Sequence, residues 1–503
     1  MIEGAIRHIL KRHHGVQEPT YNDIRAYYDK FLHPDVLDMN DKKVYKKVFH
    51  KGKWAGVFQF TENGVQKLCK QAKPNNIIDL SAITSIYRPG PLSAGVDKDY
   101  IEAKEAPLLV EYYNQEYKNV TEETYGFLIF QEQIALLAHK LGKNISLDEG
   151  NSLRKVLTKK GTGKTDKVLQ SLYDRFIEGC VEKGMTAKAA NDLWEKFKFF
   201  SGYGFNKSHA VCYSIISYQC AWLFTHYECE WLAAFLDKEP ETKKEKAISI
   251  AKSFGYGIEP LNINTSGTYW EISEDGTSLI QPLTSIKGLG ETAIQEIYKG
   301  RPFRKVEDFL FNDKMRYSKL NKKTLDVLVR SGTTNCLIDS RFTGKKHFWT
   351  AVAVDRPRKP KNLEENISLY APEGDFTTEE EIQFLTELTG EFPLSKVVSP
   401  ETLEKLEEKM IPPISEFDQN LQLTWCIPRK ITAKRTATGK EYFQVEVVDS
   451  NSAIVTVRCW GVDVAMGDRL EVNKPYLVKP DYNDEWGFST RGRIGKFWKC
   501  LAS

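Results

Sequence analysis

The chain has 503 residues, of which 41% are hydrophobic and 28% are charged, with a formal net charge of +3 and a mean hydropathy of −0.45. This length predicts several domains. No apolar run approaches the roughly 20 residues that cross a bilayer, and the first residues lack the layout of a signal peptide, so we expect a cytoplasmic protein without membrane contact. Nine cysteines without a Cys-x-x-Cys pair indicate reduced thiols.

Residues 1–245 read as mostly helical, because apolar residues recur at spacings of three and four, as in 121–140 and 191–200. A basic segment follows Leu153, and its bases could face phosphates: Arg154, Lys155, Lys159, Lys160, Lys164 and Lys167. The glycines at 161–163 predict a mobile loop, whose spacing is not that of a phosphate-binding P-loop.

A Gly-x-Gly turn at 202–204 precedes Phe205, Asn206, Lys207, Ser208 and His209, and an apolar run from 210 to 227 follows. The apolar run would pack a helix into a core and leave the start of the helix facing outward. Unpaired N–H groups and the helix dipole attract phosphate there, and Lys207 adds positive charge. The alternative is a capped helix preceded by solvated polar residues.

Residues 246–345 read as a connector with short strands followed by a tandem helix-hairpin-helix. Lys287, Gly288, Leu289 and Gly290 form the first hairpin, and a second unit runs from 320 to 332. Glycines let backbone N–H groups approach a DNA phosphate, and Lys287 would add charge. A tight turn without a ligand is the alternative.

Residues 346–420 read as a linker that is Pro-rich, then acidic, with a helix near 378–390. It carries a candidate docking peptide, in which a leucine and an aromatic side chain could fill two pockets on a partner: Asn366, Ile367, Ser368, Leu369 and Tyr370.

Residues 421–503 alternate between apolar and polar side chains, which predicts about five short strands in an OB-type barrel or another small β-barrel. Bases on its first strand could contact DNA: Arg429, Lys430, Lys434 and Arg435. Tyr442, Phe443, Trp460 and Trp486 could stack on bases, although Phe443 is the best candidate for the barrel core. The fold class is therefore multidomain and mainly α, with a C-terminal β-barrel.

Five motifs occur in a fixed order: Gly56-Val57-Phe58-Gln59-Phe60, Tyr87-Arg88-Pro89-Gly90-Pro91-Leu92, Thr124-Tyr125-Gly126, Phe130-Gln131-Glu132-Gln133 and Leu153-Arg154-Lys155. Together with the turn at 202–209 they resemble the fingers of the bacterial replicative DNA polymerase III alpha subunit, a C-family polymerase. The resemblance implies that residues 1–245 are polymerase fingers and that 366–370 bind a sliding clamp.

The resemblance also implies a nucleotide site made by Arg154, Lys155, Asn206, Lys207 and His209. The family has paired arginines where this chain has Arg154 and Lys155, and lysine lacks the bidentate fork of arginine. Arg88 could contact the nucleotide or form a structural ion pair. Gln59 could contact the nucleotide or cap a turn from a buried position.

Polymerases also need carboxylates that hold two Mg²⁺ ions. The family carries these aspartates in a palm, before its Gly-Val-Phe-Gln motif, and residues 1–55 contain no Asp-x-Asp pair. Asp97-Lys98-Asp99 has the spacing but lies within the fingers, so we interpret it as solvated surface. His209, Cys212, Cys220, His226 and Cys229 are zinc-ligand types, but a single helical segment cannot fold around an ion. We therefore expect no metal site and no catalytic residue in this chain.

These features predict a subunit of a replicative DNA polymerase that binds dNTP and template–primer DNA, with a separate palm-bearing chain supplying the Mg²⁺ site. Such a split enzyme would act at the bacterial nucleoid or in a phage-infected cell. The alternative is a non-catalytic, DNA-binding, clamp-recruited accessory protein derived from a polymerase.

Overall fold

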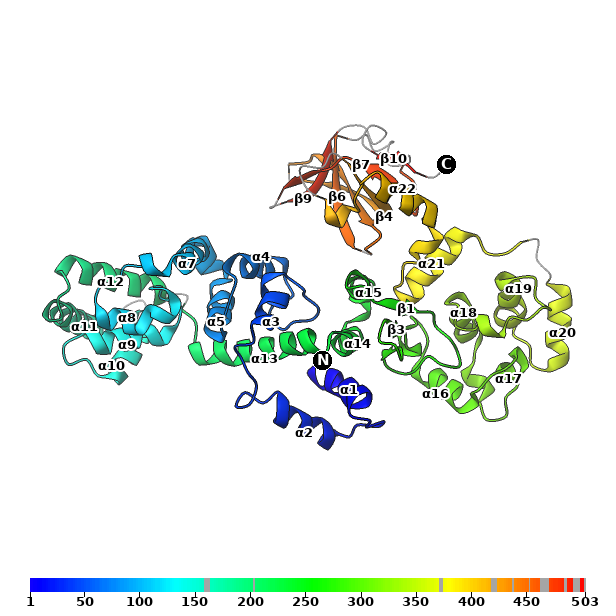
Figure 1. Ribbon diagram of the computed structural model, residues 1–503, viewed down its shortest axis with the longest axis horizontal. Helices are drawn as coiled ribbons and strands as arrows, with labels where there is room; N and C mark the ends of the chain where they lie inside the picture. The colour runs from blue at the N-terminus through cyan, green and yellow to red at the C-terminus, as the bar shows by residue number, and fades with distance from the viewer. Residues whose placement is uncertain are drawn as a thin grey trace. The chain divides into compact units, whose positions relative to one another are not determined.

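The computed structural model describes residues 1–157, 163–201, 204–370, 374–417, 423–436, 438–451, 453–461, 470–483, 486–491 and 498–501. The chain forms two compact units, Met1–Trp231 and Leu232–Ser503. The first unit is helical, and the second combines helices with two sheets (Figure 1). The predicted fold class, mainly α with a C-terminal β-domain, is confirmed. Among the described residues, no helix is long and apolar enough to cross a membrane.

The helices of the first unit are α1 (Ile2–His13), α2 (Tyr21–Phe31), α3 (Lys42–Val44), α4 (Asn63–Ala72), α5 (Ile77–Ile86), α6 (Pro89–Ser93), α7 (Val96–Glu105), α8 (Gln115–Thr121), α9 (Gln131–Leu141), α10 (Leu147–Leu157), α11 (Gly163–Glu182), α12 (Ala187–Ser201), α13 (Lys207–His226) and α14 (Glu228–Lys238), which ends in the second unit. Short helical turns lie at η1 (Tyr45–His50), η2 (Pro107–Leu109) and η3 (Glu122–Thr124).

The helices α8 to α12 surround one core, in which Phe176, Trp194 and Phe197 are fully buried and pack ring to ring. Figure 1 shows these helices gathered at the end of the unit, with α13 running away from them. At Gly150, α10 approaches α9 so closely that a Cβ atom would lie 2.5 Å from the carbonyl oxygen of Ala135. Such a contact excludes any other residue there. The expected helix over 121–140 is shorter, because α9 begins only at Gln131.

The α13 helix packs against α5 through small buried side chains, among them Ser214, which accepts a hydrogen bond from Ser81 at 3.1 Å. Beside this contact, α5 carries the fully buried Asp79. The Asp79 carboxylate pairs with Lys104 at 2.7 Å and accepts hydrogen bonds from the hydroxyls of Tyr100 and Tyr125. This buried ion pair fixes the Tyr-Gly motif against the core of the unit.

The second unit begins with helix α15 (Lys244–Ser253) and a three-stranded sheet of β1 (Gly257–Glu259), β2 (Glu271–Ile272) and β3 (Ser278–Ile280). The central strand β3 pairs in parallel with β1 and antiparallel with β2. The next helices are α16 (Glu291–Gly300), α17 (Val306–Leu310), α18 (Lys322–Arg330), α19 (Lys345–Trp349), α20 (Pro360–Leu369), α21 (Thr378–Thr389) and α22 (Pro400–Glu408). The short turns are η4 (Glu241–Lys243), η5 (Leu283–Ser285), η6 (Tyr317–Lys319), η7 (Asn335–Leu337), η8 (Thr350–Val354), η9 (Leu394–Lys396) and η10 (Ile414–Glu416).

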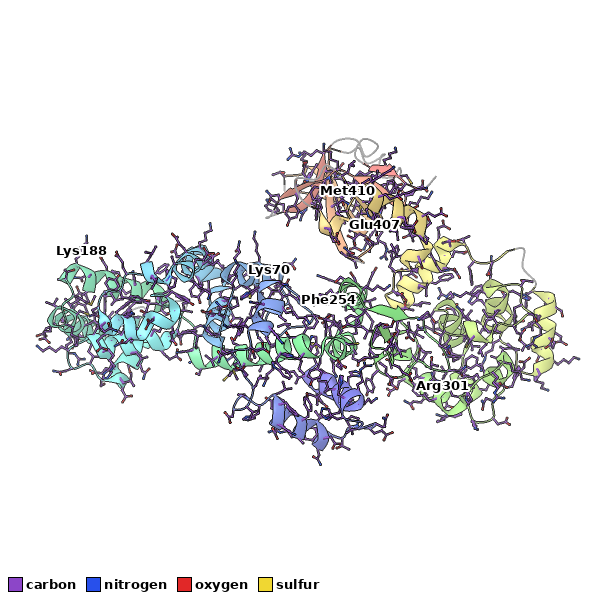
Figure 2. All side chains as sticks on the ribbon, viewed as in Figure 1. Lys70, Lys188, Phe254, Arg301, Glu407 and Met410 are labelled. Carbon is purple, nitrogen blue, oxygen red and sulfur yellow. The ribbon has the colours of Figure 1, made fainter. Side chains whose placement is uncertain are left out.

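The segment 346–420, expected to be a linker, is instead mostly helical in its described part. Phe348, Val352 and Leu363 are fully buried and join the core formed by α16, α17 and α18. Helix α21 does fall where a helix was expected. Figure 2 shows side chains along these helices and labels Arg301, the residue after α16. The Arg301 guanidinium donates to the carbonyls of Ile263 and Ser266 at 2.6 and 2.7 Å.

The C-terminal sheet has seven strands among the described residues, in the order β10-β7-β4-β5-β6-β9-β8. They are β4 (Thr424–Arg435), β5 (Glu441–Val448), β6 (Ile454–Trp460), β7 (Tyr476–Val478), β8 (Asp481–Asn483), β9 (Gly487–Arg491) and β10 (Trp498–Cys500). All pairs are antiparallel except β6 with β9. This curled, mixed sheet is consistent with an OB-like domain, although it has more strands than the five expected.

Candidate functional site

The turn before α13 is held by the Phe-Gln-Glu-Gln motif at the start of α9. Phe130 and Phe205 form a parallel β-bridge, and the amide side chain of Gln131 donates to the carbonyl of Gly204 at 2.6 Å. Gly204 leaves no room for a side chain, because a Cβ atom would lie 2.6 Å from the ring of Phe200. The motif therefore fixes where the side chains of 205–209 emerge.

The start of α13 is closed by Asn206, whose side chain accepts from the backbone N–H of His209 at 2.8 Å. The Glu132 carboxylate accepts from the Asn206 amide at 2.7 Å and from the backbone N–H of Lys207 at 2.9 Å. We expected backbone N–H groups open to phosphate at this helix start. This expectation is wrong for the N–H groups of His209 and Lys207, because they already donate to the Asn206 side chain and the Glu132 carboxylate. The capped-helix alternative describes this end of the helix better.

The ammonium of Lys207 is also engaged. It lies 2.6 and 2.7 Å from the two carboxylate oxygens of Glu123 and 5.8 Å from the centre of the Phe130 ring. Both members of the ion pair are about one-third exposed, at 32% for Lys207 and 34% for Glu123. A nucleotide that reaches Lys207 must therefore share it with Glu123 or displace that carboxylate.

Aromatic rings connect the other finger candidates. The guanidinium of Arg88 lies 4.9 Å from the centre of the Phe205 ring, and the exposed imidazole of His209 lies 5.4 Å from Phe205 and 4.2 Å from Tyr213. Tyr213 in turn contacts Phe58 at 5.2 Å. Arg88 and His209 therefore share one row of rings, which we call the finger row: Arg88, Phe205, His209, Tyr213 and Phe58.

Gln59 follows the finger row directly in sequence. It is exposed and has a left-handed backbone, with φ of 66°. The buried turn-capping role that was its alternative is therefore wrong.

Most side chains of the basic segment lie outside the described part of the chain. Arg154 and Lys155 lie on α10 and Lys164 on α11, but only their backbone is described, and Lys159 and Lys160 lie outside the described residues. What the structure does show is the base of this segment, since the buried Leu153 belongs to the same core as α9.

The described residues do not fit a Mg²⁺ site, since they hold no group of three His, Cys, Asp or Glu side chains placed for a metal. Asp97 and Asp99 are two residues apart in the first turn of α7, and residues at that spacing on a helix do not face each other. Of the zinc-ligand types, His226 instead pairs with Asp41 at 2.8 Å.

In the helix-hairpin-helix, Gly288 adopts a left-handed backbone, with φ of 86°, and Gly290 precedes α16 without any side-chain cap. Nothing lies within 4 Å of the position of a Cβ atom on Gly290. Lys287 is exposed, while its backbone N–H donates to the carbonyl of Leu388 at 2.8 Å. The hairpin is thus anchored from behind and leaves its glycine face accessible.

In α16, the buried Glu296 carboxylate binds the backbone N–H and the guanidinium of Arg316, directly before η6. Hydrogen bonds from Lys299 and Arg316 lower the pKa of Glu296 to about 2.

The bases of the C-terminal sheet divide into two groups. Arg429 is wrong as a DNA contact, because its guanidinium pairs with Glu245 and stacks over Phe392, leaving only 10% of the side chain exposed. Arg435 is 74% exposed but bonds Glu441 on the neighbouring strand. Lys430 and Lys434 are exposed, and neither forms an ion pair with another described residue.

One cross-strand row on this sheet combines cations with aromatic rings. Lys434 lies opposite Tyr442, Tyr442 opposite Trp460, and Trp460 beside Arg491 in the strand register. The Tyr442 and Trp460 rings stack at 4.5 Å, and the Lys440 ammonium lies 5.6 Å from Trp460. Phe443, on the opposite face, is buried in the core, as expected.

The candidate docking peptide, 366–370, is not extended. It forms the end of α20, where Asn366 is buried and its amide donates to the carbonyl of Ala351 at 3.0 Å. Ile367 packs against the core. Leu369 is 71% exposed, and the Tyr370 hydroxyl donates to Asp355 at 3.1 Å. The expectation of a free linker peptide is therefore wrong, because the apolar spacing of the segment lets it bury one helix face.

Glu123 and Glu132 are the site residues that sequence reasoning missed. Glu132 lies within the Phe-Gln-Glu-Gln motif, and Glu123 directly precedes the Thr-Tyr-Gly motif. An acid in or beside a motif was therefore the available sequence signal. Their partner Lys207 is 84 and 75 residues away, and no local pattern indicates that contact.

Comparison with known proteins matches the finger region and the helix-hairpin-helix region to two separate families. The bacterial DNA polymerase III alpha subunit finger domain family matches residues 10–184, and a helix-hairpin-helix motif family matches residues 255–343. The DNA polymerase III subunit alpha of Aquifex aeolicus is 32% identical over 485 residues, which is 94% of this chain and 39% of that protein.

The subunits of Campylobacter jejuni and Borreliella burgdorferi are 33% and 34% identical over 332 and 349 residues. These matches cover 65% and 67% of this chain, but only 27% and 29% of the relatives. The chain thus spans well under half the length of these relatives. With its finger region, its helix-hairpin-helix and its OB-like sheet, it is a DNA polymerase III alpha-like protein.

Proposed function

We propose that this chain is the nucleotide- and DNA-binding part of a replicative DNA polymerase. The finger row and Lys207 carry the proposal, since they bring a guanidinium, an imidazole, an ammonium and contacting aromatic rings to the start of one helix. Cations neutralise the charge of a triphosphate, and rings stack on a base. Arg154 and Lys155 would add charge from α10, and Gln59 would reach the same nucleotide from the end of the row.

Template–primer DNA would contact two further surfaces. The exposed Lys287 and Gly288 and the open space at Gly290 suit backbone phosphates without reading sequence. The row from Lys434 to Arg491 suits a single strand, because stacking on aromatic rings contributes about 1–3 kcal/mol per base. Lys159, Lys160 and Lys164 would extend the phosphate surface of the fingers.

The Mg²⁺ ions of the reaction would be held by a palm, which in this proposal is carried by a separate polypeptide. Mg²⁺ supplies charge neutralisation at the reacting phosphate, and this chain would supply grip and orientation of the nucleotide. We place the assembly at the bacterial nucleoid or in a phage-infected cell.

Reconstitution tests this function. The chain alone should not extend a primer, and extension should appear when a palm-bearing polypeptide is added with template–primer, dNTP and Mg²⁺. Extension by the purified chain alone would refute the division of labour. Failure of every palm-bearing candidate to bind this chain would count equally against it.

The carboxylates around Lys207 favour a second candidate, a polymerase-derived accessory protein that binds DNA without binding nucleotide. Glu123 and Glu132 occupy groups that a triphosphate would use. The two functions separate on Arg154→Ala and Lys207→Ala. If neither change alters dNTP binding or reconstituted synthesis, the accessory role is correct.

Clamp binding belongs to either function. Leu369 is exposed and could enter a pocket of a sliding clamp, while Asn366 and Ile367 would first have to leave the packed end of α20. Leu369→Ala should abolish retention of the chain on an immobilised sliding clamp, and Leu108→Ala, at another highly exposed leucine, should not.

A further inference from the structure

We propose that Glu123 is a carboxylate latch that holds Lys207 in the absence of nucleotide and must be displaced when the triphosphate binds. This inference rests on the proposed nucleotide-binding function. It assigns a role to a residue that no motif singled out, and it makes Glu123 a positioning residue that sets how tightly the nucleotide is held.

The geometry favours a defined latch over a chance surface pair. Both carboxylate oxygens of Glu123 lie within 2.7 Å of the Lys207 ammonium, and about two-thirds of each side chain is shielded from water. The ammonium also lies over the Phe130 ring, 5.8 Å from the ring centre. Shielding from water strengthens a charge pair relative to an exposed one.

Both ends of the latch are fixed by their surroundings. Glu123 lies in η3, where the buried Thr124 hydroxyl donates to Phe127 at 2.7 Å and accepts from Gln133 at 2.8 Å. Lys207 begins α13, where Glu132 holds its backbone N–H. Gln133 and Glu132 are neighbours on α9, so one helix end positions both partners.

A carboxylate at this place has two effects on an incoming triphosphate. It occupies the cation that the phosphate needs, and its own negative charge repels the phosphate. Exchange of partners keeps Lys207 paired in both states, so the lysine never presents an unpaired charge beside the Phe130 ring. The latch therefore weakens nucleotide binding and keeps Lys207 in position for it.

Glu123→Gln keeps the shape and removes the charge. We expect this variant of the full chain to bind dATP and inorganic tripolyphosphate about twofold to fivefold more tightly, as for loss of a partly exposed ion pair. Glu122→Gln is the matched control, because Glu122 is the neighbouring acid in η3 and pairs with Lys118 instead, at 3.6 Å. It should leave both dissociation constants unchanged.

A second measurement needs no ligand. Pulsed acylation followed by mass spectrometry reports how freely the Lys207 amine reacts, and we expect faster labelling of Lys207 in Glu123→Gln than in the wild type or in Glu122→Gln. Equal labelling in all three proteins would overturn the latch, and so would weaker or unchanged tripolyphosphate binding by Glu123→Gln.

Lys207→Ala, alone and combined with Glu123→Gln, separates failure of the latch from failure of the proposed function. If Lys207→Ala leaves dATP binding unchanged, the nucleotide site itself is misplaced. If Lys207→Ala weakens binding while Glu123→Gln does not strengthen it, only the latch is wrong. With Lys207 absent, Glu123→Gln should retain less than half of its effect on binding, measured as a ratio of dissociation constants.

Discussion

The starts of α13 and α16 are two helix ends that the sequence describes in the same way, a glycine-containing turn with a lysine. In the finger region, Asn206 and Glu132 occupy backbone N–H groups and Glu123 holds the lysine. In the helix-hairpin-helix region, Gly290 provides no cap and Lys287 is exposed. One end is already occupied by the protein's own carboxylates, and the other is accessible.

A helix start is therefore not a phosphate site by itself. Whether a helix start can bind phosphate depends on whether carboxylates from elsewhere in the chain already contact its N–H groups and its lysine. The finger end is suited to a ligand charged strongly enough to displace a carboxylate, such as a triphosphate. The hairpin end is suited to any phosphodiester that approaches, which is the behaviour expected of sequence-independent DNA contact.

Acid should separate the two regions most strongly. Burial lowers the pKa of His8, in α1, to about 4, below its ordinary value of 6.5. As pH falls below 6.5, His8 is protonated in the unfolded chain before it is protonated in the folded one. The folded state therefore has its full stability above pH 6.5 and loses the part that depends on neutral His8 as pH falls towards 4. The loss is about 3 kcal/mol, from 1.36 kcal/mol per pKa unit. Hydrogen exchange of buried α1 amides at pH 7, 5.5 and 4 measures it.

His8→Gln is the control for this prediction, because it should flatten the pH dependence of α1 between 6.5 and 4. In the helix-hairpin-helix region, Glu296 has its pKa lowered to about 2, so its contribution is present above pH 4.5 and is lost only between 4.5 and 2. Exchange of α16 amides that rises together with that of α1 near pH 5.5 would contradict the separation.

Lys207→Ala tests the occupied end. Hydrogen bonds to charged groups contribute about 1.5–3 kcal/mol, so dATP binding should weaken roughly tenfold to hundredfold. Duplex DNA binding should not change, because it depends on the hairpin end. Isothermal titration with dATP and with duplex measures both. Lys198→Ala, at an exposed lysine of α12 paired with Glu195, is the control and should change neither affinity.

Gly290→Ala tests the accessible end. The added methyl group meets nothing within 4 Å and the backbone is in the extended region, so the fold should tolerate it. The methyl group would keep a phosphate away from the backbone, and we expect duplex affinity to fall about tenfold, at the cost of one or two hydrogen bonds. Fluorescence anisotropy at fixed salt measures it. Gly276→Ala, on the turn before β3, would be a poor control because its φ is 75°, so Lys361→Ala on α20 serves instead.

Asn206→Ala should have the smallest effect. Removing an N-cap costs about 1 kcal/mol of stability. Urea unfolding of the full chain, followed by hydrogen exchange in α13, should show this loss. Asn321→Ala gives the matched loss at α18, where Asn321 caps the N–H of Thr324 at 2.9 Å. Gly290→Ala has no cap to lose, and a comparable destabilisation there would contradict the distinction between the two helix ends.

Periodicity and turn chemistry predicted the class of the fold well. The helical fingers, the hairpin at Gly288–Gly290 and the alternating strands of the C-terminal sheet all follow local patterns. The segment 346–420 did not, because its prolines and acids suggested a linker while Phe348 and Leu363 supply a buried helix face. The additional strands of the sheet are short, with three residues in β7, β8 and β10, and short runs leave little pattern.

The sequence named the candidate site residues, but it did not indicate their pairings. Arg88 and His209 both contact the Phe205 ring, whereas Lys207 lies over Phe130 and pairs with Glu123. The pairing of Arg429 with Glu245 spans 184 residues, and that of Lys207 with Glu123 spans 84. Contacts over such separations depend on tertiary packing, which no local charge count contains.

The contact at Gly150 has a mechanical consequence. It presses α10 against Ala135 in α9, and α9 is the same helix whose first turn fixes Gly204, Asn206 and Lys207. The buried Leu153 of α10 and the backbone at the start of α13 are therefore both positioned by contacts with α9. If nucleotide binding displaces α9, as the proposed function would allow, the backbone of α10 and the start of α13 would be displaced with it.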